Sequence, residues 1–235
     1  MNVGIVAPVE YLKFCNTNLH LCYSEFLSEP EYLSFYRAKT SLKKNTVILD
    51  YSPSLPRKRV NLNSLVAGIR VLKPQIVVLP SIDYSWIRTA NLSNEFAEEY
   101  DDILPKTIGM LQGIDLDSLA KCYFALKECS DIIGLGSPLE SIARREEIIR
   151  DLKITKPIIY IEVFQNPYEE VPPDNCMGMI TSYPFRLAQA LRTMAEFKPN
   201  PPALNFLAPK GKLLDDLVVK NIRDYMEVVQ EGLRV

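Results

Sequence analysis

Three carboxylates stand at or just after the ends of apolar runs in this sequence. Asp50 ends the run TVILD, Asp83 follows VVLPSI, and Glu162 lies near the end of IIYIEV. A carboxylate at such a position is poorly screened and can stabilise a developing positive charge or position water. A pair suits this chemistry, because one carboxyl can stay ionised while the more buried one is protonated. We predict Asp50 as the catalytic carboxylate, with Glu162 or Asp83 as its partner.

Amide, glycine and aromatic residues stand at similar chain positions. A glycine lets the backbone approach a flat ligand closely, an amide can meet the polar edge of that ligand, and an aromatic ring can stack on it. Aromatic rings nevertheless pack into cores more often than they bind ligands. The candidates for binding a flat ligand are Gln112, Gly113, Gly134, Gly136, Ser137, Tyr51 and Tyr84.

The charges are nearly balanced, with 27 basic and 29 acidic residues and a net charge of −2. Nucleic-acid enzymes usually carry an excess of basic residues, so this balance counts mildly against one. Basic residues can still gather on one face, although such runs are often plain solvated surface. We expect Arg57, Lys58, Arg59 and Arg186 near the rim of the site, in contact with a phosphate backbone.

Metal and disulfide chemistry have little support in the sequence. The five cysteines include no C-x-x-C pair and His20 is the one histidine, so a Cys/His zinc site is poorly supplied. We expect free thiols, no metal and no cofactor. The opening MNVGIVAPVEYLKF lacks the pattern of a secretory signal, and the apolar stretches are too short to span a bilayer. These features favour a cytoplasmic protein and leave self-association open.

Short apolar runs alternate with longer segments of helical periodicity. Strands that are apolar throughout are typical of parallel sheets covered on both faces. Apolar stripes predict helices over 62–72, 116–126, 142–152 and 185–197, and a C-terminal helix over 213–233. The long polar connection at 85–103 is either a lid or a helix with loose ends. The predicted strands are 3–7, 19–22, 46–50, 75–80, 107–112, 131–134, 157–163 and 178–181.

This alternation predicts a single-domain (β/α)₈ barrel over residues 1–235, with a doubly wound open sheet as the alternative. In such a barrel the chemistry sits at the carboxyl ends of the strands. We therefore expect the strands that end at Asp50, Pro80, Gln112 and Gly134 to be parallel neighbours. The polar residues that follow them would then share one face.

The segment IGMLQGIDLDSLAKCYFALKECSDIIGLGSP resembles the tRNA-guanine transglycosylase superfamily. It shares with that family a strand ending in Gln-Gly, a helix, and a strand ending in a glycine-rich turn. The resemblance covers roughly residues 50–189 and is closest to the short branch that inserts 7-deazaguanines into DNA. It implies a purine pocket formed by the Gln-Gly pair and the glycine turn, with Asp50 over the sugar and Asp83 reading the base.

Two departures from the family bear on the reaction. Nothing after Cys176 supplies the zinc cluster of the family, and GMITSYPFRLAQ lacks its nucleophilic aspartate near Ile180 and Thr181. Base exchange usually needs a covalent hold on the sugar, so water becomes the expected acceptor. With these departures, the resemblance predicts a DNA glycosylase, an enzyme that removes a modified base from DNA rather than from tRNA.

Three alternatives remain open at this point. A true transglycosylase would use Asp50 or Glu162 as its nucleophile and exchange guanine for a 7-deazaguanine. A catalytically silent binding subunit would lack convergent acidic groups. A barrel enzyme acting on a small phosphorylated substrate is less favoured, because TSYPFR is not a glycine-rich phosphate turn.

Overall fold

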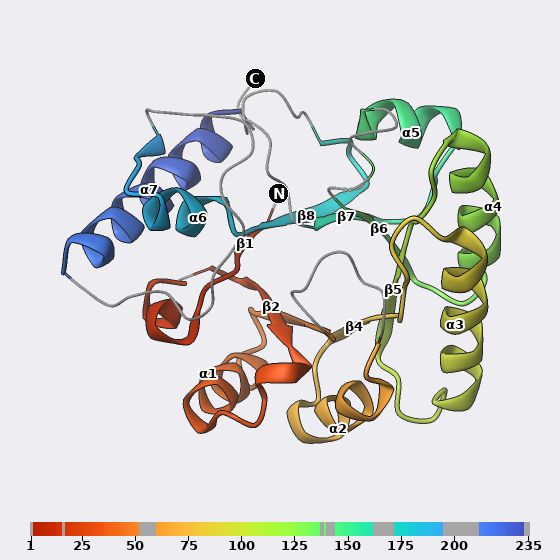
Figure 1. Cartoon of the computed structure of the whole chain (residues 1–235), viewed down its shortest axis with the longest axis horizontal. Coiled ribbons are helices and arrows are strands. Elements are labelled where there is room, and N and C mark those ends of the chain that lie inside the picture. The colour runs from red at the N-terminus through yellow and green to blue at the C-terminus, as the bar shows by residue number, and fades with distance from the viewer. Residues whose placement is uncertain are drawn as a thin grey trace.

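The protein forms a closed barrel of eight parallel strands in the order β1-β2-β3-β4-β5-β6-β7-β8, surrounded by helices (Figure 1). The computed structural model describes residues 2–15, 17–51, 60–136, 139, 144–161, 172–194 and 212–232. The predicted (β/α)₈ barrel is confirmed, and the open-sheet alternative is wrong because β1 pairs with β8 and closes the sheet.

The strands are short, as is usual in this fold. They are β1 Asn2–Ile5, β2 Leu19–Tyr23, β3 Thr46–Asp50, β4 Ile76–Val78, β5 Lys106–Met110, β6 Ile132–Gly136, β7 Ile158–Ile161 and β8 Cys176–Thr181. The chain segments ending near Asp50, Pro80, Gln112 and Gly134 are parallel neighbours, as expected.

Helices follow most of the strands. Among the described residues, the α-helices are α1 Pro30–Thr40, α2 Leu62–Leu72, α3 Trp86–Glu99, α4 Leu116–Leu126, α5 Arg145–Asp151, α6 Tyr183–Gln189 and α7 Lys212–Gly232. The 3₁₀ helices include η1 Val9–Phe14 and η2 Ser24–Phe26. The connection at 85–103 is mostly the helix α3, and α1 was not predicted. Figure 1 shows α3 and α4 side by side on one flank and α6 beside α7 on another.

Two apolar cores stabilise the barrel. One lies between the strands and the helices. The other fills the barrel interior, and its side chains are Val6, Leu19, Leu21, Tyr23, Ile48, Ile76, Val78, Ile108, Met110, Ile132, Ile159, Ile161 and Ile180. Because side chains alternate along a strand, this set identifies which positions of each strand point inward.

Helix α7 closes the fold through one buried amide. Asn221 accepts a hydrogen bond from the backbone N–H of Met194 at 3.1 Å and donates to the carbonyls of Pro184 and Arg192 at 3.2 and 2.9 Å. The Tyr225 hydroxyl lies 3.3 Å from the sulfur of Met179 on β8. These contacts hold α6 and α7 against the strand at which the barrel closes.

Candidate active site

Asp50 points into the barrel at the carboxyl end of β3. Ile48, two residues earlier on the same strand, belongs to the interior core, so the Asp50 side chain shares its face. Asp50 has no exposed surface. One of its carboxylate oxygens accepts the backbone N–H of Tyr51 at 2.7 Å. The carboxylate is therefore buried and oriented at the end of the barrel where catalytic groups of this fold lie.

Tyr23 stands beside Asp50 on the neighbouring strand. The two residues are register partners in the parallel pair β2–β3, and Tyr23 belongs to the interior core with 1% exposure. Side chains of register partners project from the same face of a sheet. The sequence analysis missed Tyr23 because it ended the strand at Cys22, although LHLCY closes on a polar residue as TVILD does.

Helix α1 fixes the carboxyl end of β2 through two tyrosines. The backbone N–H of Tyr23 donates to the Tyr32 hydroxyl at 2.9 Å, and the Tyr36 hydroxyl donates to the Leu21 carbonyl at 2.7 Å. Burial raises the pKa of Tyr32 and of Tyr36 well above the usual 10.0. Both tyrosines therefore stay neutral. Phe26 packs edge-on against the Tyr23 ring, with ring centroids 6.4 Å apart.

Several other described residues that face the interior at this end are apolar or lack a side chain. Val6, Ile161 and Ile180 belong to the interior core, and Gly136 follows Gly134 on the inward face of β6. In the described strands the single lysine is Lys106, which is exposed at the first position of β5, at the opposite end of the barrel. These strands thus offer a carboxylate and a phenol but no amine for a Schiff base.

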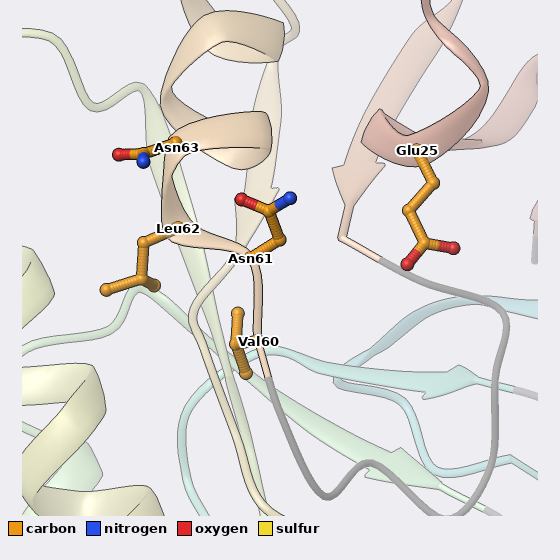
Figure 2. A pocket seen from close by; sticks show the side chains of 5 residues that line it. All are labelled: Glu25, Val60, Asn61, Leu62 and Asn63. Atoms are coloured by element: carbon orange, nitrogen blue, oxygen red, sulfur yellow. The ribbon is translucent and has the colours of Figure 1, made fainter.

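A cavity of about 660 Å³ lies over the carboxyl ends of β2 and β3. Figure 2 shows Glu25 descending from η2 on one side, and Val60, Asn61, Leu62 and Asn63 following one another on the other side, at the start of α2. Two carboxamides and a carboxylate give its wall several hydrogen-bonding groups. The size suits a small polar ligand.

Hydrogen bonds tie this cavity to the strand that carries Asp50. The Ser64 hydroxyl donates to the Ser24 hydroxyl at 3.2 Å, and Ser24 donates to the Tyr51 carbonyl at 3.2 Å. Asn61 caps α2 by accepting the backbone N–H of Ser64 at 3.1 Å. The start of α2 is therefore fixed relative to the residue next to Asp50.

A second cluster of predicted residues lies at the rim, after β4 and β5. The amide of Gln112 donates to a carboxylate oxygen of Asp83 at 3.3 Å and its oxygen accepts the backbone N–H of Tyr84 at 3.1 Å. Tyr84 is 52% exposed and has a left-handed backbone with φ 64°. A non-glycine residue in that conformation is strained and is often found at functional sites.

The same loop is held from α3. The Thr89 hydroxyl accepts the backbone N–H of Ile82 at 2.9 Å and donates to the Ile82 carbonyl at 3.1 Å. The Ser93 hydroxyl donates to the Pro80 carbonyl at 2.7 Å. The structure thus brings Asp83, Gln112 and Tyr84 together, whereas Asp50 stands with Tyr23.

Other predicted binding residues have local packing roles. Tyr51 lies on the outer face of β3, buried, and its hydroxyl donates to the Ser81 carbonyl at 2.8 Å. A Cβ atom on Gly134 would lie 2.2 Å from the Met110 sulfur, and one on Gly113 would lie 2.5 Å from the Ser118 hydroxyl. These glycines leave room for neighbouring side chains, so their positions do not require a bound base.

The remaining predicted residues add little to the site as described. Arg186 is half-buried on α6. Glu162 and Ser137, together with the basic run Arg57, Lys58 and Arg59, lie outside the described residues. Within the described ranges, no group of three His, Cys, Asp or Glu residues is placed to hold a metal ion. No helix among them is long and apolar enough to cross a membrane.

Comparison with solved structures shows the fold. A chain of the tryptophan synthase α2β2 complex of the hyperthermophile Pyrococcus furiosus matches with a TM-score of 0.58 and 9% identity, over 96% of this chain and 97% of that one. The YdjI aldolase of Escherichia coli K12 matches with a TM-score of 0.54 and 10% identity, over 97% and 88%. No family model and no curated protein matches the sequence.

These comparisons correct the expected reaction. The prediction of a DNA glycosylase is wrong, since the solved structures that match over nearly the whole chain include a chain of tryptophan synthase and an aldolase. The prediction depended on glycine motifs, and Gly113 and Gly134 are explained by packing. The nucleic-acid partner, self-association and the transglycosylase resemblance stay untested predictions. The chain is a single-domain (β/α)₈ barrel that shares its fold with these enzymes.

Proposed function

We propose that the protein is an enzyme that moves a proton at the carbon next to the carbonyl group of a small molecule, as a lyase of the aldolase type does. The observation that carries this proposal is the Asp50 carboxylate, fully buried and inward-facing at the carboxyl end of the barrel. A carboxylate there has apolar neighbours and little water to screen it, so it is suited to act as a general base.

The cavity at this end of the barrel favours a small substrate over a polymer. The cavity over β2 and β3 has about 660 Å³, which is within the range of small-molecule sites. Its polar wall of Glu25, Asn61 and Asn63 can hold hydroxyl or carbonyl groups of a ligand. The apolar interior below excludes water, which protects a reactive enol or enolate.

The comparisons support this class of reaction without assigning it. An aldolase and a chain of tryptophan synthase share the fold over nearly the whole length of the chain. The described strands carry no interior lysine, so a Schiff-base route through a strand lysine is not part of the proposal. Proton transfer by Asp50 is the chemistry that these strands do supply.

Exchange of carbon-bound protons for deuterium tests the proposal without knowledge of the natural substrate. The probes are pyruvate, acetaldehyde, dihydroxyacetone and glyceraldehyde, each in D₂O and followed by ¹H NMR. We expect the protein to exchange the protons next to the carbonyl of at least one probe faster than heat-denatured protein does. Exchange of none of them above that background would contradict the proposal.

A further inference from the structure

We propose that Tyr23 is a second catalytic residue of this site, which donates its phenolic proton to the carbonyl oxygen of the substrate while Asp50 removes the proton from carbon. This inference rests on the proposed function and adds a general acid, Tyr23, to it. The sequence analysis assigned no role to Tyr23.

The geometry places the two groups together. Tyr23 and Asp50 are register partners on β2 and β3, and neighbouring strands lie about 4.8 Å apart. Both residues are the last of their strands, both face the interior, and they are 1% and 0% exposed. The two side chains therefore leave the sheet side by side, at the end of the barrel where the catalytic groups of this fold lie.

The chemistry of the pair is complementary. A carboxylate accepts a proton and a phenol donates one, so the two groups have opposite roles. When the C–H bond breaks, its electron pair forms the carbon–carbon double bond. The carbonyl π electrons move to oxygen, which takes the proton of Tyr23, while Asp50 holds the proton from carbon. The proton on Asp50 exchanges with solvent before a proton returns to carbon, and that return restores both groups, so no oxidant or reductant is needed.

Two of the contacts that hold Tyr23 do not involve its hydroxyl. Its backbone N–H is held by Tyr32 and its ring by Phe26, so the Tyr23→Phe substitution retains both interactions. Among the described residues, the titratable groups near Tyr23 include Asp50 on β3 and Tyr32 on α1. Tyr32 stays protonated, because burial raises its pKa well above 10.0.

Tyr160 provides a matched control. It is also a strand tyrosine near the carboxyl end of its strand and is 1% exposed. Its ring faces away from the barrel interior, toward Arg145 on α5, whose guanidinium carbon lies 5.2 Å from the ring centroid. Tyr160→Phe removes the same hydroxyl from the opposite face of the sheet.

The experiment measures deuterium exchange into the best probe from pH 5 to 10.5 for the wild type, Tyr23→Phe, Tyr160→Phe and Asp50→Asn, with thermal unfolding of each variant. We expect Tyr23→Phe to slow exchange by on the order of 10²-fold throughout this pH range. Tyr160→Phe keeps the wild-type rate and profile.

The outcomes separate the two proposals. Exchange by Tyr23→Phe at the wild-type rate overturns the role of Tyr23, even if Asp50→Asn is inactive and the proposed function stands. An equal loss in Tyr160→Phe also overturns it, because the effect would then reflect stability. Absence of exchange by the wild type overturns both proposals.

Discussion

The side-chain oxygen of Gln112 lies 3.1 Å from the backbone nitrogen of Tyr84 and accepts its N–H, and the amide nitrogen of the same residue donates to Asp83 at 3.3 Å. Gln112 is 3% exposed, so a buried residue after β5 fixes the loop that follows β4. The left-handed backbone of Tyr84 is maintained by this contact. Gln112 therefore links the loop after β4 to the end of β5.

Substitutions of Tyr84 test whether its backbone is strained. Tyr84→Gly and Tyr84→Ala both remove the exposed ring, but only glycine adopts φ 64° without strain. We expect the free energy of unfolding of Tyr84→Gly to exceed that of Tyr84→Ala by about 1 kcal/mol. Urea unfolding of the two variants measures the difference. A more stable alanine variant would show that the left-handed conformation is not maintained in solution.

Two glutamines at opposite ends of the barrel separate stability from function. Gln75 accepts the N–H of Val47 at 2.8 Å and donates to the Thr40 carbonyl at 3.2 Å, so it makes two hydrogen bonds as Gln112 does. We expect Gln112→Ala and Gln75→Ala each to lower the free energy of unfolding by about 2 kcal/mol.

Of these two variants, only Gln112→Ala should also reduce deuterium exchange, through a several-fold higher KM for the probe. Urea unfolding and exchange kinetics check both parts. Equal effects of the two substitutions on exchange would show that the loop between β4 and α3 is not part of the site.

The sequence was sufficient to predict the barrel and part of the candidate site. Strands that are apolar on both faces and separated by amphipathic helices are compatible with few folds other than this barrel. Asp50 points into the barrel because side chains alternate along TVILD, which puts Asp50 and Ile48 on the same face. The proximity of Asp83 and Gln112 followed from the parallel order of β4 and β5.

Other features depend on contacts that a single sequence does not reveal. Helix α1 buries Tyr32 and Tyr36 but has no continuous apolar stripe, so its periodicity was not recognised. The buried side of α3 is Thr89, Ala90, Ser93 and Phe96, which looks polar along the chain. From the sequence, Gly134 was predicted to belong to a ligand-binding turn. The structure explains this glycine by packing, because a Cβ atom there would meet the Met110 sulfur.

His20 makes the stability depend on pH. Burial lowers its pKa from 6.5 to about 4, with Lys39 adding to the shift. The folded protein therefore binds this proton less well than the unfolded chain. The contribution of neutral His20 is complete above pH 6.5 and falls as the pH drops from 6.5 to about 4, with a total of roughly 3 kcal/mol.

Urea unfolding between pH 4 and 7 measures this dependence. His20→Leu removes the titrating group from a site lined by Phe35 and Tyr36, so we expect a flatter profile over that interval. The same slope in wild type and variant would assign the pH dependence to other groups.

The central claim is that Asp50 performs the proton transfer, and the most direct test compares Asp50→Asn with Asp131→Asn. Asp131 precedes β6 at the other end of the barrel, where it accepts the N–H of Thr107 at 2.8 Å, so its substitution controls for the loss of a strand-end carboxylate. The measurement is the rate of deuterium exchange into the best carbonyl probe at pH 7. We predict a fall of 10²-fold or more for Asp50→Asn and the wild-type rate for Asp131→Asn. Wild-type exchange by a folded Asp50→Asn variant would contradict the account.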